Sequence, residues 1–145
     1  MRLDGPDSTE ALGRRLAAQL RARDVVALFG DLGAGKTTLA RGILAGLGHD
    51  GEVASPTFPI VIPYEDLRIP VWHVDLYRIE DWAEIDELAL DEALVDGALI
   101  VEWPERMGDD LWPRSLRLAL RREGEGARSL TAGVPAAWEA RWPLP

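Results

Sequence analysis

One octapeptide constrains the fold of this chain more than any other feature. Residues 30–37 read Gly-Asp-Leu-Gly-Ala-Gly-Lys-Thr and fit the pattern G-x-x-x-x-G-K-[ST]. A short apolar run, residues 25–29, precedes the pattern, and a segment with apolar residues at helical spacing follows it. A strand, a glycine-rich turn and a helix in this order are the setting in which the pattern binds phosphate. The sequence therefore predicts a nucleotide-binding loop.

The residue types of this loop suit a triphosphate and its metal ion. Glycines let the backbone turn so that successive N–H groups converge on an anion, and the helix that follows adds its own unpaired N–H groups. Lys36, the single lysine of the chain, is expected to bind the β and γ phosphates of ATP. The Thr37 hydroxyl is expected to ligate Mg²⁺, and Thr38 to lie near the α phosphate. The remaining predicted loop residues are Leu32, Gly33, Ala34 and Gly35.

Strands and helices alternate along the rest of the chain. This order predicts a single three-layer α/β domain over residues 1–145, similar to P-loop NTPases, with a mostly parallel central sheet and antiparallel edge strands. Asp7 and Glu10 have the spacing of a helix N-cap pair. The predicted helices cover residues 7–23, 36–47, 79–94 and 135–141; the predicted strands cover 25–29, 60–64, 69–75 and 98–102, and a hairpin joins 115–122 to 127–131.

The composition narrows the classes of partner. The chain has 25 acidic and 16 basic residues and a net charge of −9, which disfavours direct, tight binding to nucleic acid because that binding depends on cationic surfaces. It has no cysteine and only two histidines, which argues against disulfides and against a zinc site. No apolar run is long enough to span a bilayer, and the first ten residues do not resemble a signal peptide. We expect a cytoplasmic protein with protein partners.

Two predicted strands end in carboxylates, Asp75 and Glu102. In open α/β sheets, ligands bind at the carboxyl ends of the strands, where the phosphate loop also lies. Either acid is suited to bind Mg²⁺ while the other orients the attacking water, and a simple cap on a strand end is the alternative for each. Thr57, in the Ser-Pro-Thr-Phe segment 55–58, is placed either to sense the γ phosphate or to form a surface turn.

Other residues carry weaker signals. Trp72 and Trp103 are interpreted as packing residues. The arginines near the predicted hairpin tip, Arg121, Arg122 and Arg128, are interpreted as a solvated edge, with a nucleotide or partner contact as the alternative.

Four segments taken together resemble the TsaE family, the bacterial ATPases that assist threonylcarbamoyl-adenosine modification of tRNA. The likeness runs from the first helix to the hairpin. The H-x-D-x-Y-R element and the V-E-W element make it specific. The segments are residues 29–38 (FGDLGAGKTT), 55–58 (SPTF), 73–78 (HVDLYR) and 101–104 (VEWP).

This resemblance implies a Mg²⁺-dependent ATPase that is weak alone. Its implied partners are the threonylcarbamoyl transferase subunit and that subunit's inactive paralogue. ATP hydrolysis, stimulated by this pair, would reset it between rounds of modification at tRNA position 37, and the tRNA would be held mainly by the partners. The implied residue roles are phosphate binding by Lys36, Mg²⁺ binding by Thr37 and Glu102, hydrolysis by Asp75, a switch-loop role for Thr57, and proximity to adenine for Thr9 and Gly124.

The alternative functions require different sequence elements. A small GTPase would need an N-K-x-D element, but the chain has no asparagine and its only lysine lies in the phosphate loop. A small-molecule kinase of the P-loop class remains an alternative, because such kinases share the loop. A nucleotide-dependent assembly factor that does not hydrolyse ATP is a third possibility, in which Asp75 is structural.

Overall fold

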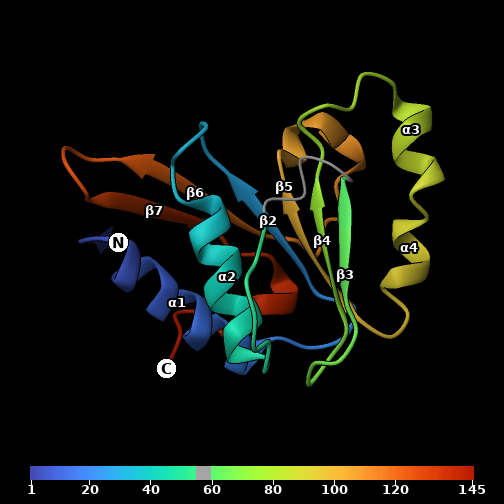
Figure 1. The fold of residues 1–145 in the computed structure, drawn as a ribbon. Coiled ribbons are helices and arrows are strands. Elements are labelled where there is room, and N and C mark those ends of the chain that lie inside the picture. Colours follow the sequence, from blue (N-terminus) through green and yellow to red (C-terminus); the bar gives the residue numbers. More distant parts are fainter. Residues whose placement is uncertain (55–59) are drawn as a thin grey trace.

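The computed structural model describes residues 1–54 and 60–145. The predicted switch residue Thr57 lies outside the described residues. Within the described ranges, seven strands form one sheet in the order β1-β7-β6-β2-β5-β4-β3 (Figure 1). The four central strands β6, β2, β5 and β4 run parallel, and the outer pairings β1–β7, β7–β6 and β3–β4 are antiparallel. The predicted mixed sheet with a parallel centre and antiparallel edges is confirmed.

The elements follow the predicted order. The strands are β1 (Arg2–Leu3), β2 (Val25–Phe29), β3 (Val61–Tyr64), β4 (Val71–Asp75), β5 (Ala98–Glu102), β6 (Leu116–Arg122) and β7 (Arg128–Gly133). The helices are α1 (Pro6–Gln19), α2 (Lys36–Gly46), α3 (Trp82–Glu87) and α4 (Leu90–Ala93), with the 3₁₀ segments η1 (Pro104–Asp110) and η2 (Ala136–Trp138). The two-residue strand β1 was not predicted.

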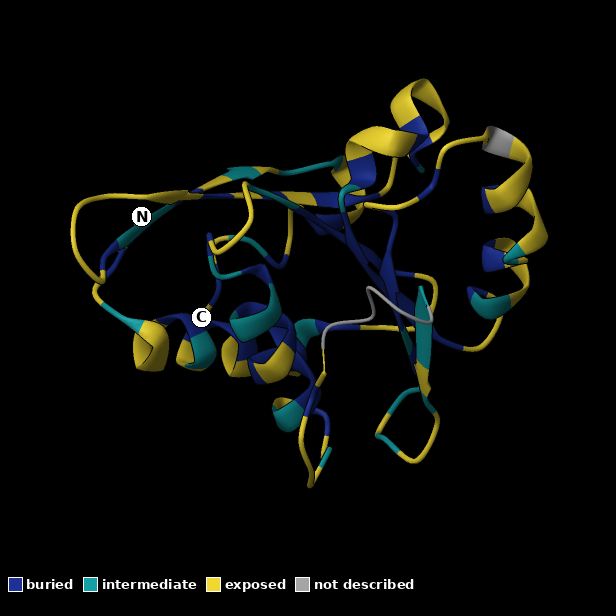
Figure 2. Ribbon diagram, turned by 45° about the horizontal axis from the view of Figure 1, so that its top comes forward, coloured by how far each residue is buried: buried dark blue, intermediate teal, exposed yellow. Residues whose placement is uncertain are grey.

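Helices cover both faces of the sheet, so the domain has the predicted three layers. One buried cluster joins α1 and α2 to one face, and a second joins α3, α4 and η1 to the other. Figure 2 shows the central strands buried between these layers. All five residues of β5 are buried, because a parallel strand at the centre of a sheet is covered on both faces.

Close backbone contact joins α1 to α2. A Cβ at Gly13 would overlap the backbone of α2 at Leu39 and Ile43, and a Cβ at Gly42 would overlap the Glu10 carbonyl. Small residues on both facing helix surfaces therefore allow the two axes to approach closely. Since α2 begins directly at the phosphate loop, this contact also holds the loop against α1.

Three predicted helices differ in detail from the observed ones. The first begins at Pro6 behind Gly5, not behind Asp7, because proline is pre-organised for the first helical position; it ends at Gln19, before a turn in which Asp24 accepts the Arg21 N–H. The predicted closing helix is limited to η2. Beyond η2, Arg141 forms a buried ion pair with Asp24 at 2.6 Å.

The predicted helix over residues 79–94 is two short helices. Ala89 has a left-handed backbone, φ 53° and ψ 42°, and separates α3 from α4. Ile85 and Leu90 are both buried against the sheet. Residues five apart lie about 140° apart around a straight helix, so the break allows both side chains to face the core.

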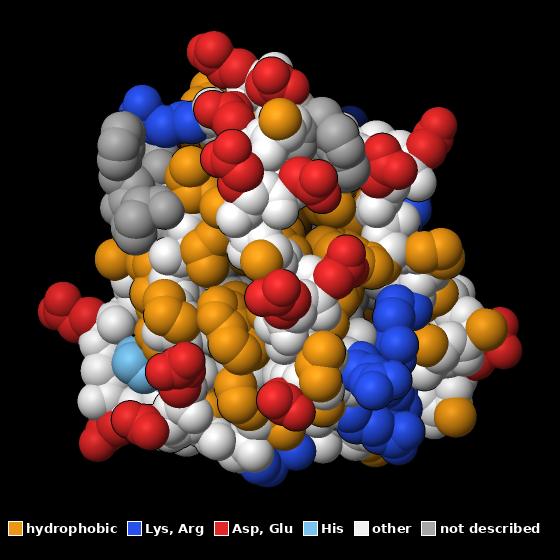
Figure 3. Space-filling model, turned by 90° about the vertical axis from the view of Figure 1, so that its right-hand side faces the viewer, with side chains coloured by type: hydrophobic (Ala, Val, Ile, Leu, Met, Phe, Trp, Pro, Cys, Tyr) orange, Lys and Arg blue, Asp and Glu red, His pale blue; other side chains and the backbone are white. Residues whose placement is uncertain are grey.

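The α3–α4 side of the molecule is acidic. Figure 3 views this side and shows Asp and Glu side chains scattered over it. Residues 80–96 contain no Lys or Arg, and their acids are Glu80, Asp81, Glu84, Asp86, Glu87, Asp91, Glu92 and Asp96. Among the described residues, no helix has the length and apolar character to cross a bilayer.

Candidate functional site

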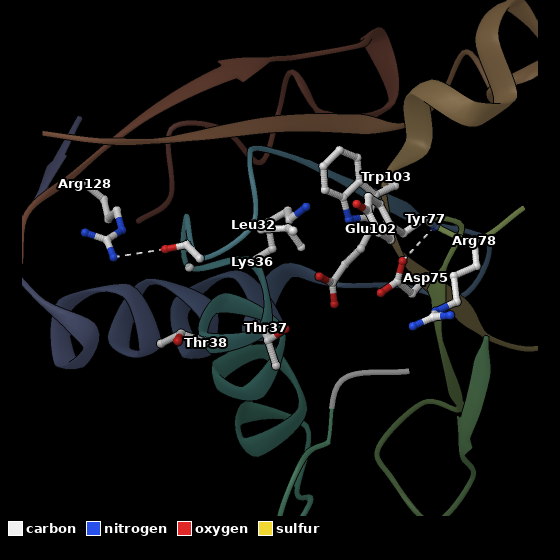
Figure 4. A pocket seen from close by; sticks show the side chains of 12 residues that line it. Leu32, Lys36, Thr37, Thr38, Asp75, Tyr77, Arg78, Glu102, Trp103 and Arg128 are labelled. Carbon is white, nitrogen blue, oxygen red and sulfur yellow. Dashed lines mark hydrogen bonds between the residues drawn. The ribbon is translucent and has the colours of Figure 1, made fainter. Parts of the chain in front are cut away.

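A pocket of about 460 Å³ lies where the parallel strands end (Figure 4). β2 leads into the phosphate loop, and β4 and β5 end in Asp75 and Glu102. This edge is the one at which ligands bind in open α/β sheets. The lining residues are Leu32, Gly33, Gly35, Lys36, Thr37, Thr38, Asp75, Tyr77, Arg78, Glu102, Trp103 and Arg128.

The phosphate loop has the backbone that its glycines allow. Gly33 and Gly35 have φ of 77° and 107°, in the left-handed region that L side chains rarely adopt. The Ala34 N–H donates to the Asp31 carbonyl at 3.0 Å, which closes the turn. Helix α2 then begins at Lys36, so its unpaired N–H groups lie at the pocket. The predicted loop residues from Leu32 to Thr38 are brought together, with Ala34 buried beneath the loop.

Lys36 is a buried cation in this pocket. Lys36 is only 4% exposed to solvent, and its Nζ lies 3.7 Å from the centroid of the Trp103 ring. Within the described part of the chain, this ammonium has no hydrogen-bond partner. Burial lowers the pKa of Lys36 below the ordinary lysine value, while nearby carboxylates, chiefly that of Glu102, act in the opposite direction. The site therefore holds a cation whose hydrogen-bonding capacity is left for an anion.

Asp75 and Glu102 form the opposite wall of the pocket. They are register partners at the ends of adjacent parallel strands. The Asp75 Oδ1 accepts the Tyr77 N–H at 2.9 Å, and the Glu102 Oε2 lies 2.6 Å from Nε2 of the fully buried His73. Both carboxylates are thus oriented by neighbouring groups. Asp75 and Glu102 both line the pocket, at the edge of the sheet where the sequence predicts them.

The residues fit a Mg²⁺ ion that is shared with a phosphate. Carboxylate and hydroxyl oxygens are the ligands that Mg²⁺ prefers, and the pocket offers both types, from Glu102, Asp75 and Thr37. In the described parts of the chain, no group of three or more His, Cys, Asp or Glu side chains could hold a metal ion. A protein site of few ligands suits Mg²⁺, which usually keeps waters and phosphate oxygens in its shell.

Trp103 has a second position besides its predicted one. It packs against the core cluster that joins α3, α4 and η1 to the sheet, as predicted, and it also lines the pocket beside Lys36 and Tyr77. Its backbone is left-handed, with φ 59° and ψ 47°, and Pro104 begins η1 directly after it. The signal that could have found it is its position immediately after the carboxylate that ends β5.

The hairpin arginines partly correct the expectation of a solvated edge. Arg121 and Arg122 are exposed, as expected, and Arg128 is half-buried, but Arg122 and Arg128 also donate hydrogen bonds to carbonyl oxygens of the phosphate loop. The sequence reasoning missed them because it placed the whole hairpin at an antiparallel edge. Instead, β6 pairs in parallel with β2, so β6 ends at the same edge of the sheet as the pocket.

The two residues expected near adenine lie in different places. Thr9 lines a small cavity of about 80 Å³ beside the phosphate loop, together with Thr38, Gly126 and Arg128. Gly124 lies in the turn between β6 and β7, with φ 71°, and does not line that cavity. Its neighbour in the turn, Gly126, does.

This fold and this pocket define an α/β protein of the P-loop class, with the glycine-rich loop and two strand-end carboxylates on one edge of the sheet. A family model described as "Threonylcarbamoyl adenosine biosynthesis protein TsaE" matches residues 3–130. The chain belongs to the TsaE family.

Individual relatives agree with this assignment. The TsaE protein of Bacillus subtilis, named for tRNA threonylcarbamoyladenosine biosynthesis, is 40% identical over 127 residues, which cover 87% of this chain and 79% of that protein. The protein of the same name from Streptomyces coelicolor is 48% identical over 114 residues, which cover 77% of each chain. The crystal structure of B. subtilis YdiB has a TM-score of 0.77 and 33% identity, and the match covers 91% of this chain and 82% of that one.

Proposed function

We propose that this protein is a Mg²⁺-dependent ATPase that acts as an accessory protein in tRNA threonylcarbamoyladenosine biosynthesis. The family supplies the pathway. The observation that carries the ATPase proposal is the Lys36 ammonium, which is buried and lacks a hydrogen-bond partner in the described residues, beside the glycine-rich loop and opposite two carboxylates. A polyphosphate provides the anion that this arrangement lacks.

The binding roles follow from where each group lies. The amides of the loop and of the first turn of α2 bind phosphate oxygens, and the Lys36 ammonium binds the β and γ phosphates. Thr37 and Glu102 are the residues that would hold Mg²⁺. Bound there, Mg²⁺ supplies neutralisation of the charge on the phosphate oxygens. The adenosine part of the nucleotide is proposed to lie on the surface beside Thr9, at the opening of the small cavity there.

Asp75 is the residue proposed for hydrolysis. Its Oδ1 accepts a backbone N–H, which fixes the carboxylate in the pocket. The carboxylate orients the attacking water and accepts its proton as the new P–O bond forms and the bond to the ADP oxygen breaks. Glu102 is instead in contact with the His73 side chain. This difference favours Mg²⁺ binding as the role of Glu102 and hydrolysis as the role of Asp75.

The surface charge supports work through protein partners. The net charge of −9 and the eight acidic residues among residues 80–96 disfavour contact with a phosphate backbone, so we propose that the tRNA is held by the partners. The partners proposed are the threonylcarbamoyl transferase subunit and its inactive paralogue, and cytoplasmic work with them is part of the proposal. Their binding is expected to raise a low intrinsic turnover.

Phosphate release from Mg·ATP tests this function, measured with and without the purified transferase pair and tRNA. Phosphate release that needs no small-molecule phosphate acceptor, and that becomes faster when the transferase pair is added, supports the ATPase function. Phosphate that appears on a small metabolite would instead identify a kinase. Nucleotide-dependent assembly with no turnover, unchanged in Asp75→Asn, would identify an assembly factor that does not hydrolyse ATP.

A further inference from the structure

Arg128 bridges the β6–β7 hairpin and the phosphate loop. Its Nε donates to the Ala34 carbonyl at 2.9 Å, and its Nη2 donates to the Gly33 carbonyl at 3.2 Å. Its Nη1 donates to the carbonyl of the preceding residue, Ala127, at 2.9 Å, which fixes the guanidinium to the connection between β6 and β7. Figure 4 shows this side chain reaching across to the loop. One planar fork thus binds two successive carbonyls of the loop.

Arg122 approaches the same loop from β6. Its Nε donates to the Gly33 carbonyl at 3.3 Å. A Cβ at Gly33 would overlap the Arg122 guanidinium, so a larger residue at this position would require the end of this arginine to move. Gly33 therefore has two properties that matter here. Its backbone is left-handed, and its lack of a side chain leaves the space that the Arg122 guanidinium occupies.

These bonds affect the amides that bind phosphate. The Ala34 carbonyl and the Gly35 N–H belong to one peptide group. The Gly33 carbonyl shares its peptide group with the Ala34 N–H, which donates to the Asp31 carbonyl and closes the turn. A hydrogen bond accepted by the carbonyl from a guanidinium polarises the N–H of the same group and makes it a stronger donor. It also fixes the orientation of the peptide plane, so the Gly35 N–H is held in direction before an anion arrives.

The two arginines also oppose each other in the sheet. Arg122 and Arg128 are register partners in the antiparallel β6–β7 pair. Like charges directly across a pair of strands are destabilising. The carbonyls of the loop offset part of this repulsion in the free protein, and an anion in the adjacent pocket would offset more of it. Nucleotide binding and the closed end of the hairpin therefore favour each other.

We propose that Arg122 and Arg128 form a guanidinium clamp on the phosphate loop, and that they are positioning residues for phosphate binding. The clamp holds the Gly33 and Ala34 carbonyls in place, and through the Ala34 carbonyl it strengthens the N–H of Gly35, which lines the pocket. The inference rests on the proposed nucleotide binding and extends it to residues of the hairpin. Its ligand class is a nucleoside di- or triphosphate.

Titration calorimetry with Mg·ADP tests the clamp. The variants are Arg128→Ala, Arg122→Ala and Arg128→Lys. The matched control is Arg121→Ala, because Arg121 is an exposed arginine on β6 next to Arg122. Hydrogen bonds to charged groups predict that Arg128→Ala weakens ADP binding about tenfold or more and Arg122→Ala about threefold, while Arg121→Ala stays within about twofold of the parent. Arg128→Lys keeps the charge but loses the fork, so it is expected to weaken binding about fivefold.

Different outcomes reject different statements. If the parent binds ADP and all four variants bind it equally well, the clamp is wrong and the proposed function stands. If Arg128→Lys matches the parent while Arg128→Ala does not, charge alone is sufficient and the fork has no role. If the parent itself does not bind ADP, the proposed function fails. Thermal unfolding of each variant separates misfolding from weak binding, and Arg122→Ala and Arg128→Lys keep the test decisive if Arg128→Ala does not fold.

Discussion

The two walls of the pocket are built in different ways. The phosphate loop is one continuous segment, residues 30–38, and it acts through backbone amides whose directions are set by glycines. The opposite wall is made of side chains from β4 and β5, far apart in sequence, which meet because Asp75 and Glu102 are register partners. The first wall therefore depends on backbone shape and one ammonium, whereas the second depends on the charge of individual carboxylates. Substitutions should therefore separate nucleotide affinity from turnover.

The largest expected effect is on the carboxylate wall. Asp75→Asn keeps the shape of the side chain but removes its capacity to accept a proton. We expect turnover of Mg·ATP to fall by about 10²- to 10⁴-fold, the usual contribution of a general base, while ADP affinity stays within about threefold. Single-turnover phosphate release and calorimetry measure the two quantities. Asp66→Asn, on an exposed turn, is the control; full turnover in Asp75→Asn would remove Asp75 from the mechanism.

The second effect is on the loop wall. Lys36→Met keeps an apolar stem against Trp103 and removes the ammonium. Because charge-assisted hydrogen bonds to phosphate are lost, ADP affinity should fall by about 10²-fold. Calorimetry with Mg·ADP measures this, with Arg121→Ala as a control for loss of one positive charge. An unchanged affinity would show that the phosphates bind elsewhere.

A smaller effect is expected from Glu102→Gln. The amide keeps the size of the side chain but is a poorer Mg²⁺ ligand than a carboxylate. The Mg²⁺ concentration needed for half-maximal nucleotide binding should rise about tenfold, while binding at saturating Mg²⁺ should recover. A Mg²⁺ titration at fixed ADP measures the midpoint. If the midpoint moves in Asp75→Asn and not in Glu102→Gln, the two carboxylates have exchanged roles.

The smallest effect concerns stability without nucleotide. Burial lowers the pKa of Lys36, so the charged form costs the folded state free energy below that lowered pKa. Lys36→Met should therefore raise the free energy of unfolding at neutral pH, and with it the Tm, because the buried charge is removed. The gain should shrink as the pH rises from the lowered pKa towards the ordinary lysine value of 10.5, because the parent then loses the same charge. A variant less stable than the parent at neutral pH would contradict this.

The two walls were also unequally predictable from sequence. The loop and α2 followed from a local pattern, because glycine, lysine and threonine at fixed spacing determine the turn and the helix start. The carboxylates followed from the rule that strand ends meet at one edge. The arginine clamp could not be predicted, because it depends on β6 lying parallel beside β2, a pairing that no local pattern in Leu116–Arg122 reveals.

Errors in the helices have a similar origin. The break at Ala89 keeps Ile85 and Leu90 on the buried side, and only the position of the sheet decides which residues must be buried. The predicted N-cap of the first helix is wrong. Asp7 and Glu10 have the spacing of a capping box, but the helix begins at Pro6 with Gly5 as its N-cap. Tertiary packing and proline geometry prevailed over the spacing pattern in these two cases.

Comparison of ADP with AMP in the parent protein tests the central claim most directly. If the loop and the Lys36 ammonium bind the β phosphate, calorimetry with Mg²⁺ present should give one site per chain and an affinity for ADP about 10²-fold or more above that for AMP. Equal affinities for the two nucleotides, or no binding of either, would contradict a polyphosphate site at this pocket.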